Sequence, residues 1–264
     1  MTEAPLFSLN DVCFNYGKTR VLDHISLDMS AGHFFGIVGP NGCGKTTLLD
    51  LLIGCKTPSH GTLSFLGKSI GELSKNYLAR QIALVPQEFD TGFGFTVEEI
   101  VLMGRHPYIN RFSSASELDW QLIDRAITNI GIENLRSRYT NTLSGGQKQR
   151  VIVARALAQD TPVLLFDEAT SSLDIQFTLQ IFNHARELVR RQKKTVVAVI
   201  HDLNLAAAYC DQLIFMKDGT IFTYGQIEQT LTVDTISSIF GVTANIDSNT
   251  FNNSLQISFQ YGEK

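Results

Sequence analysis

The chain has 264 residues, of which 44% are hydrophobic and 18% charged, and its formal net charge is −4. A chain of this length can bury a sizeable core, in one large domain or in two small ones. The mildly acidic balance provides no general attraction to nucleic acid or to anionic lipid, so the composition argues against nucleic acid as a partner.

The chain carries no clear signal for export, membrane insertion or disulfide bonding. Its first residues, MTEAPLFSLN, lack a basic n-region, so we expect no signal peptide. No apolar stretch approaches the ~20 residues that a membrane helix needs. The scattered cysteines form no CxxC pair, so their spacing predicts neither a disulfide nor a zinc site and favours a reducing cytosol. These cysteines are Cys13, Cys43, Cys55 and Cys210.

Strand patterns open the chain. Leu6 to Tyr16 and Ile25 to Met29 alternate apolar and polar residues, whereas the continuous apolar run HFFGIV, which ends at Val38, is typical of a buried strand. TTLLDLLIG follows with helical spacing and a glycine stop at Gly54. TLSF and IALV, the latter ending at Val85, are predicted to be further strands.

The middle of the chain has helical patterns. Capping-box patterns at Thr96 and Ser116 each precede apolar residues at helical spacing, and a third helix is predicted from Ser144 to Gln159. The strands VLLF, TVVAVI and QLIFMK then return with helices between them. This order predicts an α/β fold interrupted by a helical insert from about residue 88 to 160, and a hairpin or tail after Gly241.

One glycine-rich loop lies between a predicted buried strand and a predicted helix. Its sequence, GPNGCGKT, fits the phosphate-loop pattern GxxxxGK[ST], in which backbone N–H groups and a helix N-terminus meet phosphate. The alternative is a glycine turn without a ligand. We expect a nucleoside triphosphate here, with Lys45 on the outer phosphates and the Thr46 hydroxyl on Mg²⁺. The predicted binding residues of the loop are Gly39, Asn41, Gly42, Cys43, Gly44, Lys45, Thr46 and Thr47.

A second motif, LSGGQ, opens the third predicted helix. Ser144 and Gln147 form a plausible capping box, which is the purely structural interpretation. Gly145 and Gly146, however, weaken a first helical turn by ~1 kcal/mol each. They are useful if the phosphate of another molecule must approach the backbone there.

With these motifs in this order, nearly the whole chain resembles the ATP-binding cassette (ABC) ATPases. Gln87 matches the family's Q-loop, LSGGQ its signature, Asp167 and Glu168 its second Walker motif, and His201 its switch histidine. Ser171, Ser172, Leu173 and Asp174 match its D-loop, and Tyr16 stands where the family places an aromatic residue for adenine. The resemblance implies a P-loop NTPase (RecA-like) core, an N-terminal antiparallel β subdomain and an inserted α-helical signature subdomain. It places the ATPase domain at residues 1–241 and a tail or small hairpin at 242–264.

The resemblance also implies roles for these residues in ATP hydrolysis. Glu168 is expected to act as the general base, His201 to donate a hydrogen bond to the γ-phosphate, and Lys45 to act beside them. Mg²⁺ needs few protein ligands besides water and phosphate oxygens, so Thr46, Gln87 and Asp167 are a sufficient set. The remaining residues expected at ATP are Tyr16, Gln87, Ser144, Gly145, Gly146, Gln147 and Asp174.

Structural alternatives stay open for several of these positions. An acidic pair at a strand end can serve solvation or helix capping, and Tyr16 can be an ordinary strand-end tyrosine. Cys43 replaces the commoner serine, so we expect intact binding but a thiol sensitive to oxidation. Ala169 replaces the common proline, with little expected loss of function. The histidines that match no motif are expected to be structural or at the surface: His24, His33, His60, His106 and His184.

A single cassette without a coiled coil or a basic patch resembles the separate ATPase subunit of a bacterial importer. VLMGRHPY is similar to the segment of ATPases for iron–siderophore, haem and cobalamin uptake, within a stretch, Phe89 to Phe112, that meets the membrane subunit in the family. A manganese or zinc importer ATPase, or a non-transport ABC ATPase acting on nucleic acid, are the alternatives. The implied partners are a second copy in a head-to-tail dimer, membrane-spanning permease subunits and, indirectly, a substrate-binding protein. The implied location is the cytoplasmic face of the cell membrane.

Overall fold

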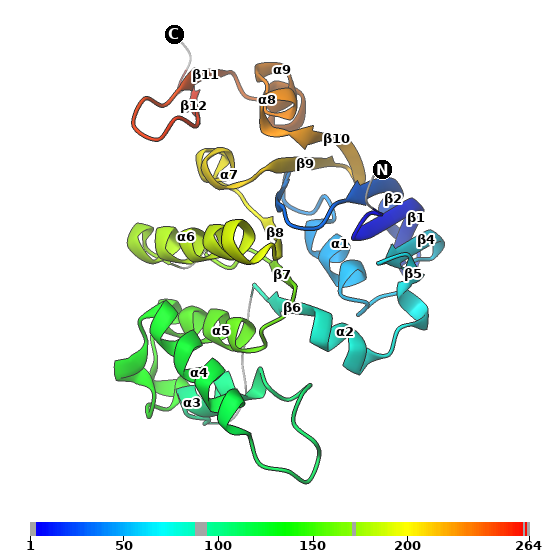
Figure 1. The fold of residues 1–264 in the computed structure, drawn as a ribbon. Coiled ribbons are helices and arrows are strands. Elements are labelled where there is room, and N and C mark those ends of the chain that lie inside the picture. The colour runs from blue at the N-terminus through cyan, green and yellow to red at the C-terminus, as the bar shows by residue number, and fades with distance from the viewer. Residues whose placement is uncertain (1–3, 88–93, 171–172, 261, 263–264) are drawn as a thin grey trace. The chain divides into compact units, whose positions relative to one another are not determined.

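The computed structural model describes residues 4–87, 94–170, 173–260 and 262. The chain forms two compact units. The first unit comprises Met1–Leu73 and Val197–Lys264, and the second comprises Ser74–Val196. Figure 1 shows the helices and strands of both.

The N-terminal part of the first unit is an antiparallel sheet in the order β2-β1-β4-β5. Its strands are β1 (Phe7–Tyr16), β2 (Thr19–Met29), β4 (His60–Phe65) and β5 (Lys68–Ser69). Phe7 pairs with Phe65 across β1 and β4, and their ring centroids lie 5.0 Å apart in the core. The predicted antiparallel β subdomain is therefore confirmed.

A second set of strands in this unit positions the phosphate loop, which follows β3 (Phe34–Val38), and His201, which follows β8 (Thr195–Val199). Strands β9 (Gln212–Lys217) and β3 are parallel neighbours, with β10 (Thr220–Gln226) antiparallel on the far side of β9. All five residues of β3 are buried, as its unbroken apolar pattern predicts. The last part of β8 adjoins β3, because the N–H of Ile200 donates to the carbonyl of Ile37 at 3.1 Å.

Short helices and a hairpin complete the first unit. The helices are α1 (Lys45–Leu52), α7 (Leu203–Tyr209), α8 (Ile227–Thr230) and α9 (Val233–Phe240), and a 3₁₀ turn spans Ile70–Glu72. The expected C-terminal hairpin is present as β11 (Ala244–Ser248) and β12 (Leu255–Phe259). It is attached to α7 because the Asn204 amide donates to the carbonyl of Ile257 at 3.2 Å and accepts from its N–H at 2.7 Å.

The second unit contains a parallel strand pair and several helices. Strands β6 (Ile82–Val85) and β7 (Val163–Phe166) pair in register from their first residues to their last. Helices α3, α4 and α5 pack against one another. The helices of this unit are α2 (Lys75–Gln81), α3 (Val97–Met103), α4 (Glu117–Ile130), α5 (Gly145–Ala158) and α6 (Ile175–Gln192), with 3₁₀ turns at Glu133–Leu135 and Thr140–Thr142.

Reciprocal capping boxes begin three of these helices. Thr96, Ser116 and Ser144 each accept the backbone N–H three residues on, and the side chain found there bonds back to the cap. These contacts confirm the predicted helix starts, while the boundaries of the insert, about residues 88 to 160, remain a prediction. None of the helices in the described ranges is long and apolar enough to traverse a lipid bilayer.

Candidate functional site

The glycine-rich loop of the first unit follows the buried strand β3 and leads directly into α1. A Cβ atom on Gly39 would lie 2.2 Å from the Met216 carbonyl oxygen, and one on Gly44 would lie 2.6 Å from Leu22 Cδ2. Gly44 also has φ of +101° as it caps α1. Only glycine satisfies these constraints, so the loop is held close against β9 and β2 while the N–H groups of the first turn point out of the helix end. Such a loop fits the phosphates of a nucleotide.

Lys45 lies within this loop. The residue as a whole is 5% exposed. Its ammonium donates to the carbonyls of Gly39 at 2.9 Å and Pro40 at 2.8 Å. A buried ammonium needs such partners, and the loop thereby fixes the cation at its own centre. Thr46 is exposed at the second position of α1, whereas Thr47 is buried. The loop therefore presents a cation and a hydroxyl next to the helix N-terminus.

His201 lies at the same strand edge as this loop. It follows β8, whose end adjoins β3 through the bond from Ile200 to Ile37, and its side chain is exposed. Asp202 directly after it caps α7, accepting the N–H groups of Asn204 at 2.8 Å and Leu205 at 3.2 Å. The predicted position of His201 at the carboxyl end of a buried strand is confirmed, and the capped helix fixes the backbone after it.

Tyr16 ends β1 with half of its side chain exposed. The Lys56 Nζ atom lies 5.1 Å from its ring centroid and 3.2 Å from the carboxylate of Asp50. Contact with Tyr16, and then with Asp50, raises the pKa of Lys56 above its ordinary value. Lys56 and Asp50 belong to no sequence motif, and only the fold brings them to Tyr16.

In the second unit, the paired strands β6 and β7 bring the Q-loop glutamine to the acidic pair. Because Val85 pairs with Phe166, the residues that follow both strands lie at one edge. Gln87 Nε2 donates to Glu168 Oε2 at 2.9 Å, and the N–H of Asp167 donates to the Val85 carbonyl at 2.9 Å. The structure thus brings together residues that are far apart in the sequence.

Asp167 and Glu168 differ in their surroundings. Asp167 is 5% exposed at the end of β7, which suits a carboxylate that binds a cation. Glu168 has φ of +49°, a left-handed conformation that costs a non-glycine residue about 1–3 kcal/mol. Ala169 behind it is buried. An unfavourable backbone conformation at a polar strand end points to a functional constraint on Glu168.

The signature segment forms the N-terminus of α5. Ser144 accepts the N–H of Gln147 at 3.3 Å, and the Ser144 N–H donates to Gln147 Oε1 at 3.0 Å, so the capping interpretation is correct for this pair. It does not explain Gly145, where an added Cβ would meet no atom within 4 Å. Gly145 therefore has no packing reason to be glycine. Close approach of a ligand to the backbone remains the reason that we propose.

The D-loop and the stretch after the Q-loop are described only in part. Ser171, Ser172 and the residues Phe89 to Phe93 lie outside the described residues. Asp174 caps α6 by accepting the N–H of Phe177 at 3.0 Å. A local structural role is therefore established for Asp174, and its expected contact with ATP remains a prediction.

Cys43 is buried in the phosphate loop. Burial raises the pKa of its thiol, and this effect outweighs the opposing effect of nearby Lys45. A thiol with a raised pKa forms little of the thiolate that reacts with oxidants. Burial of Cys43 therefore favours a slowly reacting thiol over the expected sensitivity to oxidation, which stays a prediction.

The histidines outside the motifs have varied surroundings. His33 Nδ1 lies 2.9 Å from the Ala31 carbonyl, and burial lowers the pKa of His184. His106 is exposed. His24 and His60 are at the surface, as expected, but both contact Asp11 in a polar cluster.

The mixed α/β fold and the phosphate loop define a P-loop nucleotide-binding protein. Residues 22–171 match the model of the ABC transporter family, and the chain belongs to this family. It is 44% identical over 222 residues to the cobalamin import ATP-binding protein BtuD of Halobacterium salinarum, and the match covers 84% of the chain but 55% of BtuD. The chain therefore spans little more than half the length of that relative.

Two further comparisons cover most of both proteins. The chain is 37% identical over 227 residues to the ferric enterobactin transport ATP-binding protein FepC of Escherichia coli (strain K12), with 86% of the chain and 84% of FepC covered. A solved structure described as an inward-facing conformation of a metal-chelate type ABC transporter matches with a TM-score of 0.83 and 27% identity, covering 97% of this chain and 98% of the other.

Proposed function

We propose that the chain is the ATP-hydrolysing subunit of an importer and drives uptake of a metal chelate through a separate membrane permease. The observation that carries this proposal is the contact between Gln87 and Glu168 at the edge where β6 and β7 end. The cargo class is supported by the relatives, since BtuD is named for cobalamin import and FepC for ferric enterobactin transport.

The phosphate loop would bind the nucleotide and its metal ion. Lys45 would transfer its hydrogen bonds from the loop carbonyls to the outer phosphates, which carry more negative charge. Thr46, Gln87 and Asp167 supply hydroxyl, amide and carboxylate oxygens, the donor types that Mg²⁺ prefers. When bound, Mg²⁺ neutralises the charge that develops on the phosphate oxygens.

Glu168 would act on the attacking water. Its carboxylate accepts the proton of the water as the water attacks the terminal phosphorus and the bond to the ADP oxygen breaks. The Gln87 amide holds one carboxylate oxygen at 2.9 Å, so Glu168 is oriented before the water arrives. His201 would donate a hydrogen bond to the γ-phosphate, and Tyr16 would stack on adenine with the ring face that Lys56 does not cover.

The signature residues Ser144, Gly145, Gly146 and Gln147, with Asp174, would contact ATP bound to a second copy of the chain. Two copies would pair head to tail, and the pair would attach to permease subunits at the cytoplasmic face of the membrane. A substrate-binding protein would deliver the chelate to the permease on the other side. Closure on ATP and opening after hydrolysis would then be transmitted to the permease.

Co-purification and uptake measurements test this function together. The chain isolated from its own cells should bring with it a polytopic permease, and ATP-dependent uptake of cobalamin or a ferric siderophore should stop in a Glu168→Gln strain. Loss of Mn²⁺ or Zn²⁺ uptake alone would favour the alternative importer. Strong stimulation of ATP hydrolysis by DNA or RNA, with no permease bound, would contradict transport altogether.

A further inference from the structure

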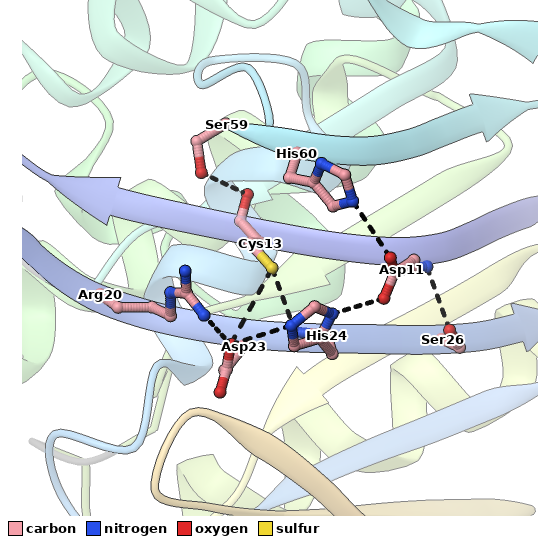
Figure 2. A network of polar contacts seen from close by, with 8 residues as sticks. All are labelled: Asp11, Cys13, Arg20, Asp23, His24, Ser26, Ser59 and His60. Atoms are coloured by element: carbon pink, nitrogen blue, oxygen red, sulfur yellow. Dashed lines mark hydrogen bonds and ion pairs between the residues drawn. The ribbon is translucent and has the colours of Figure 1, made fainter.

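A cluster of metal-binding side chain types lies on the antiparallel sheet of the first unit (Figure 2). We name it the His24 cluster; its members are Asp11 and Cys13 on β1, Asp23 and His24 on β2, and His60 on β4. The pairing of β1 with β2 is irregular between Leu9 and Phe14, and that of β1 with β4 between Asn10 and Cys13. Such irregularities change the direction of side chains, and here they bring residues from three strands together.

Asp11 orients both histidines. Its Oδ1 lies 2.6 Å from His24 Nδ1, and its Oδ2 lies 3.1 Å from His60 Nε2. A carboxylate oxygen accepts hydrogen bonds, so Asp11 engages Nδ1 of His24 and leaves Nε2 as the ring nitrogen available to a metal ion. A carboxylate behind a histidine in this way is the usual support of a metal-binding imidazole.

Three atoms that can bind a metal ion lie close together beside the pair of Asp11 and His24. A ring nitrogen of His24, a carboxylate oxygen of Asp23 and Cys13 Sγ lie within 4.8 Å of one another. His24 Nε2 is 3.7 Å from Asp23 Oδ1, and Cys13 Sγ is 4.0 Å from the same oxygen. Zinc–ligand bonds of about 2.0–2.3 Å at tetrahedral angles place two ligand atoms about 3.5 Å apart. The two pairs that include Asp23 Oδ1 need to close by only a few tenths of an ångström, and the pair of Cys13 Sγ and the His24 nitrogen, within 4.8 Å, by about 1.3 Å at most.

We propose that Cys13, Asp23 and His24 bind a divalent transition-metal ion of the Zn²⁺ class, with Asp11 as the positioning residue. Sulfur and imidazole ligands favour such an ion over Mg²⁺ and Ca²⁺, which prefer oxygen. The buried Cys13 sulfur accepts the backbone N–H of His24 at 3.3 Å, a contact that fixes the sulfur beside His24. Three protein ligands leave a fourth position for water or another small ligand.

A surface hollow gives access to the proposed metal site, and Arg20 competes with a bound ion for Asp23. Asp23 and His24 line this surface hollow together with Ser26 and residues 220–224 of β10. Arg20 Nη1 lies 2.6 Å from Asp23 Oδ1, the oxygen that the ion would use. This ion pair is solvent-exposed and therefore weak, so a bound ion can displace the guanidinium. Removing Arg20 should consequently improve metal binding.

Cobalt titration of the full chain, without nucleotide and with a non-thiol reductant, tests the site directly. Co²⁺ is the probe because thiolate ligation gives it a near-ultraviolet charge-transfer absorption that oxygen ligands do not produce. We expect this absorption to saturate at one equivalent of Co²⁺ and to disappear when Zn²⁺ is added. Failure of the absorption to develop, or its continued growth without saturation, would overturn the proposal.

Matched variants separate this site from adventitious binding. Cys13→Ser should abolish the absorption, whereas Cys55→Ser, which removes the exposed cysteine outside the cluster, should leave it unchanged. Asp11→Asn should weaken binding about 10–100-fold, because only the support of His24 changes. Arg20→Gln should bind more tightly than the wild type. An absorption that survives Cys13→Ser, or equal affinities in Asp11→Asn and wild type, would contradict the assignment. Circular dichroism and the melting temperature of each variant without metal verify that the variant folds.

Discussion

At the scale of one residue, the backbone conformation and the hydrogen bond of Glu168 both orient its carboxylate. Its backbone has φ of +49°, and its carboxylate is held by Gln87 at 2.9 Å. Both features fix the direction of the carboxylate, and the proposed role of Glu168 as general base requires such orientation before water binds. The backbone conformation is unfavourable for any residue with a Cβ atom, so orientation is obtained at the expense of stability.

Replacement of Glu168 by glutamine should separate binding from turnover. The amide cannot accept the proton of the attacking water, so Glu168→Gln should bind MgATP normally and hydrolyse it about 10²–10⁴-fold more slowly. Lys45→Ala should instead weaken binding itself. Equilibrium titration and single-turnover kinetics measure the two effects. Wild-type turnover in Glu168→Gln would show that another group is the base.

The backbone conformation of Glu168 predicts a gain in stability with glycine. Glu168→Gly and Glu168→Ala should both lack activity, but only glycine adopts positive φ freely. The glycine variant should therefore unfold with a free energy about 1 kcal/mol higher than the alanine variant. Urea denaturation of the two proteins measures this difference. An alanine variant as stable as the glycine variant would mean that the left-handed conformation is not maintained.

The raised pKa of Cys43 predicts a thiol that reacts slowly. At pH 7 iodoacetamide should modify the exposed Cys55 first and leave Cys43 and ATP binding intact. Because the pKa of Cys43 lies above its ordinary value, its modification should accelerate only in more alkaline solution. Peptide mass spectrometry identifies the modified residue. Rapid labelling of Cys43 at pH 7, prevented by MgATP, would be the opposite result.

At the scale of elements, one arginine ties three helices together. The buried Arg105 guanidinium donates from Nε to Asp119 Oδ1 at 2.8 Å and from Nη1 to the carbonyls of Ala158 and Gln159, each at 3.0 Å. It thus joins the residues after α3 to the first turn of α4 and the end of α5. Arg105 belongs to the segment VLMGRHPY, so part of that segment has a structural function whatever its permease contacts are.

Breaking this buried pair should destabilise the second unit. Arg105→Met leaves Asp119 as a buried charge and removes the partner of two carbonyls, so we expect a loss of about 3–5 kcal/mol in unfolding free energy. Arg105→Met combined with Asp119→Leu should lose less than the sum of the single variants. Additive losses would show that the two side chains act independently.

Asp119 should also make stability depend on pH. Burial raises its pKa, but the bonds from Ser116 and Arg105 outweigh burial and leave the pKa below its ordinary value. Its contribution is therefore complete above the unfolded-state pKa of about 4 and is lost as the pH falls through the folded-state value. Unfolding free energies of wild type and Asp119→Asn, measured from pH 7 downward, should converge in acid. Parallel curves would exclude Asp119 as the group responsible.

Local patterns predicted these elements far better than the contacts between them. The caps at Thr96 and Ser116 depend on residues three positions away, so the sequence was sufficient to find them. Arg105 contacts a carbonyl 53 positions away, and the His24 cluster depends on irregular strand pairing that alternation does not reveal. Motif order predicted that Gln87 and Glu168 share a site, but only the register of β6 and β7 shows their contact.

At the scale of the whole molecule, the proposed nucleotide-binding residues are divided between the two units. The phosphate loop, Tyr16 and His201 belong to the first unit. Gln87, Glu168 and the signature at the start of α5 belong to the second. If two copies pair head to tail, each site takes Lys45 from one chain and Ser144 from the other.

Mixing two inactive variants tests this shared site. Lys45→Ala and Ser144→Arg homodimers each contain two damaged sites, but a mixed dimer contains one doubly damaged site and one intact site. Mixing should therefore restore ATP-dependent pairing or some ATP hydrolysis above either variant alone. The measurement requires conditions in which the wild type pairs, with permease present if needed. A responsive wild type together with no recovery in the mixture would contradict shared sites.

The C-terminal hairpin matters for how the protein can be engineered. Its strand β12 is attached to Asn204 of α7, the helix that follows His201, by two hydrogen bonds, so deletion after Gly241 would remove both of these bonds. At the tip of the hairpin the Phe251 N–H donates to Asn249 Oδ1 at 2.9 Å, within the loop itself, and Phe251 is 97% exposed. An epitope or a fluorescent label is therefore better inserted at residues 250–253 than substituted for the hairpin, because exposed loop tips tolerate insertion while the strands stay attached.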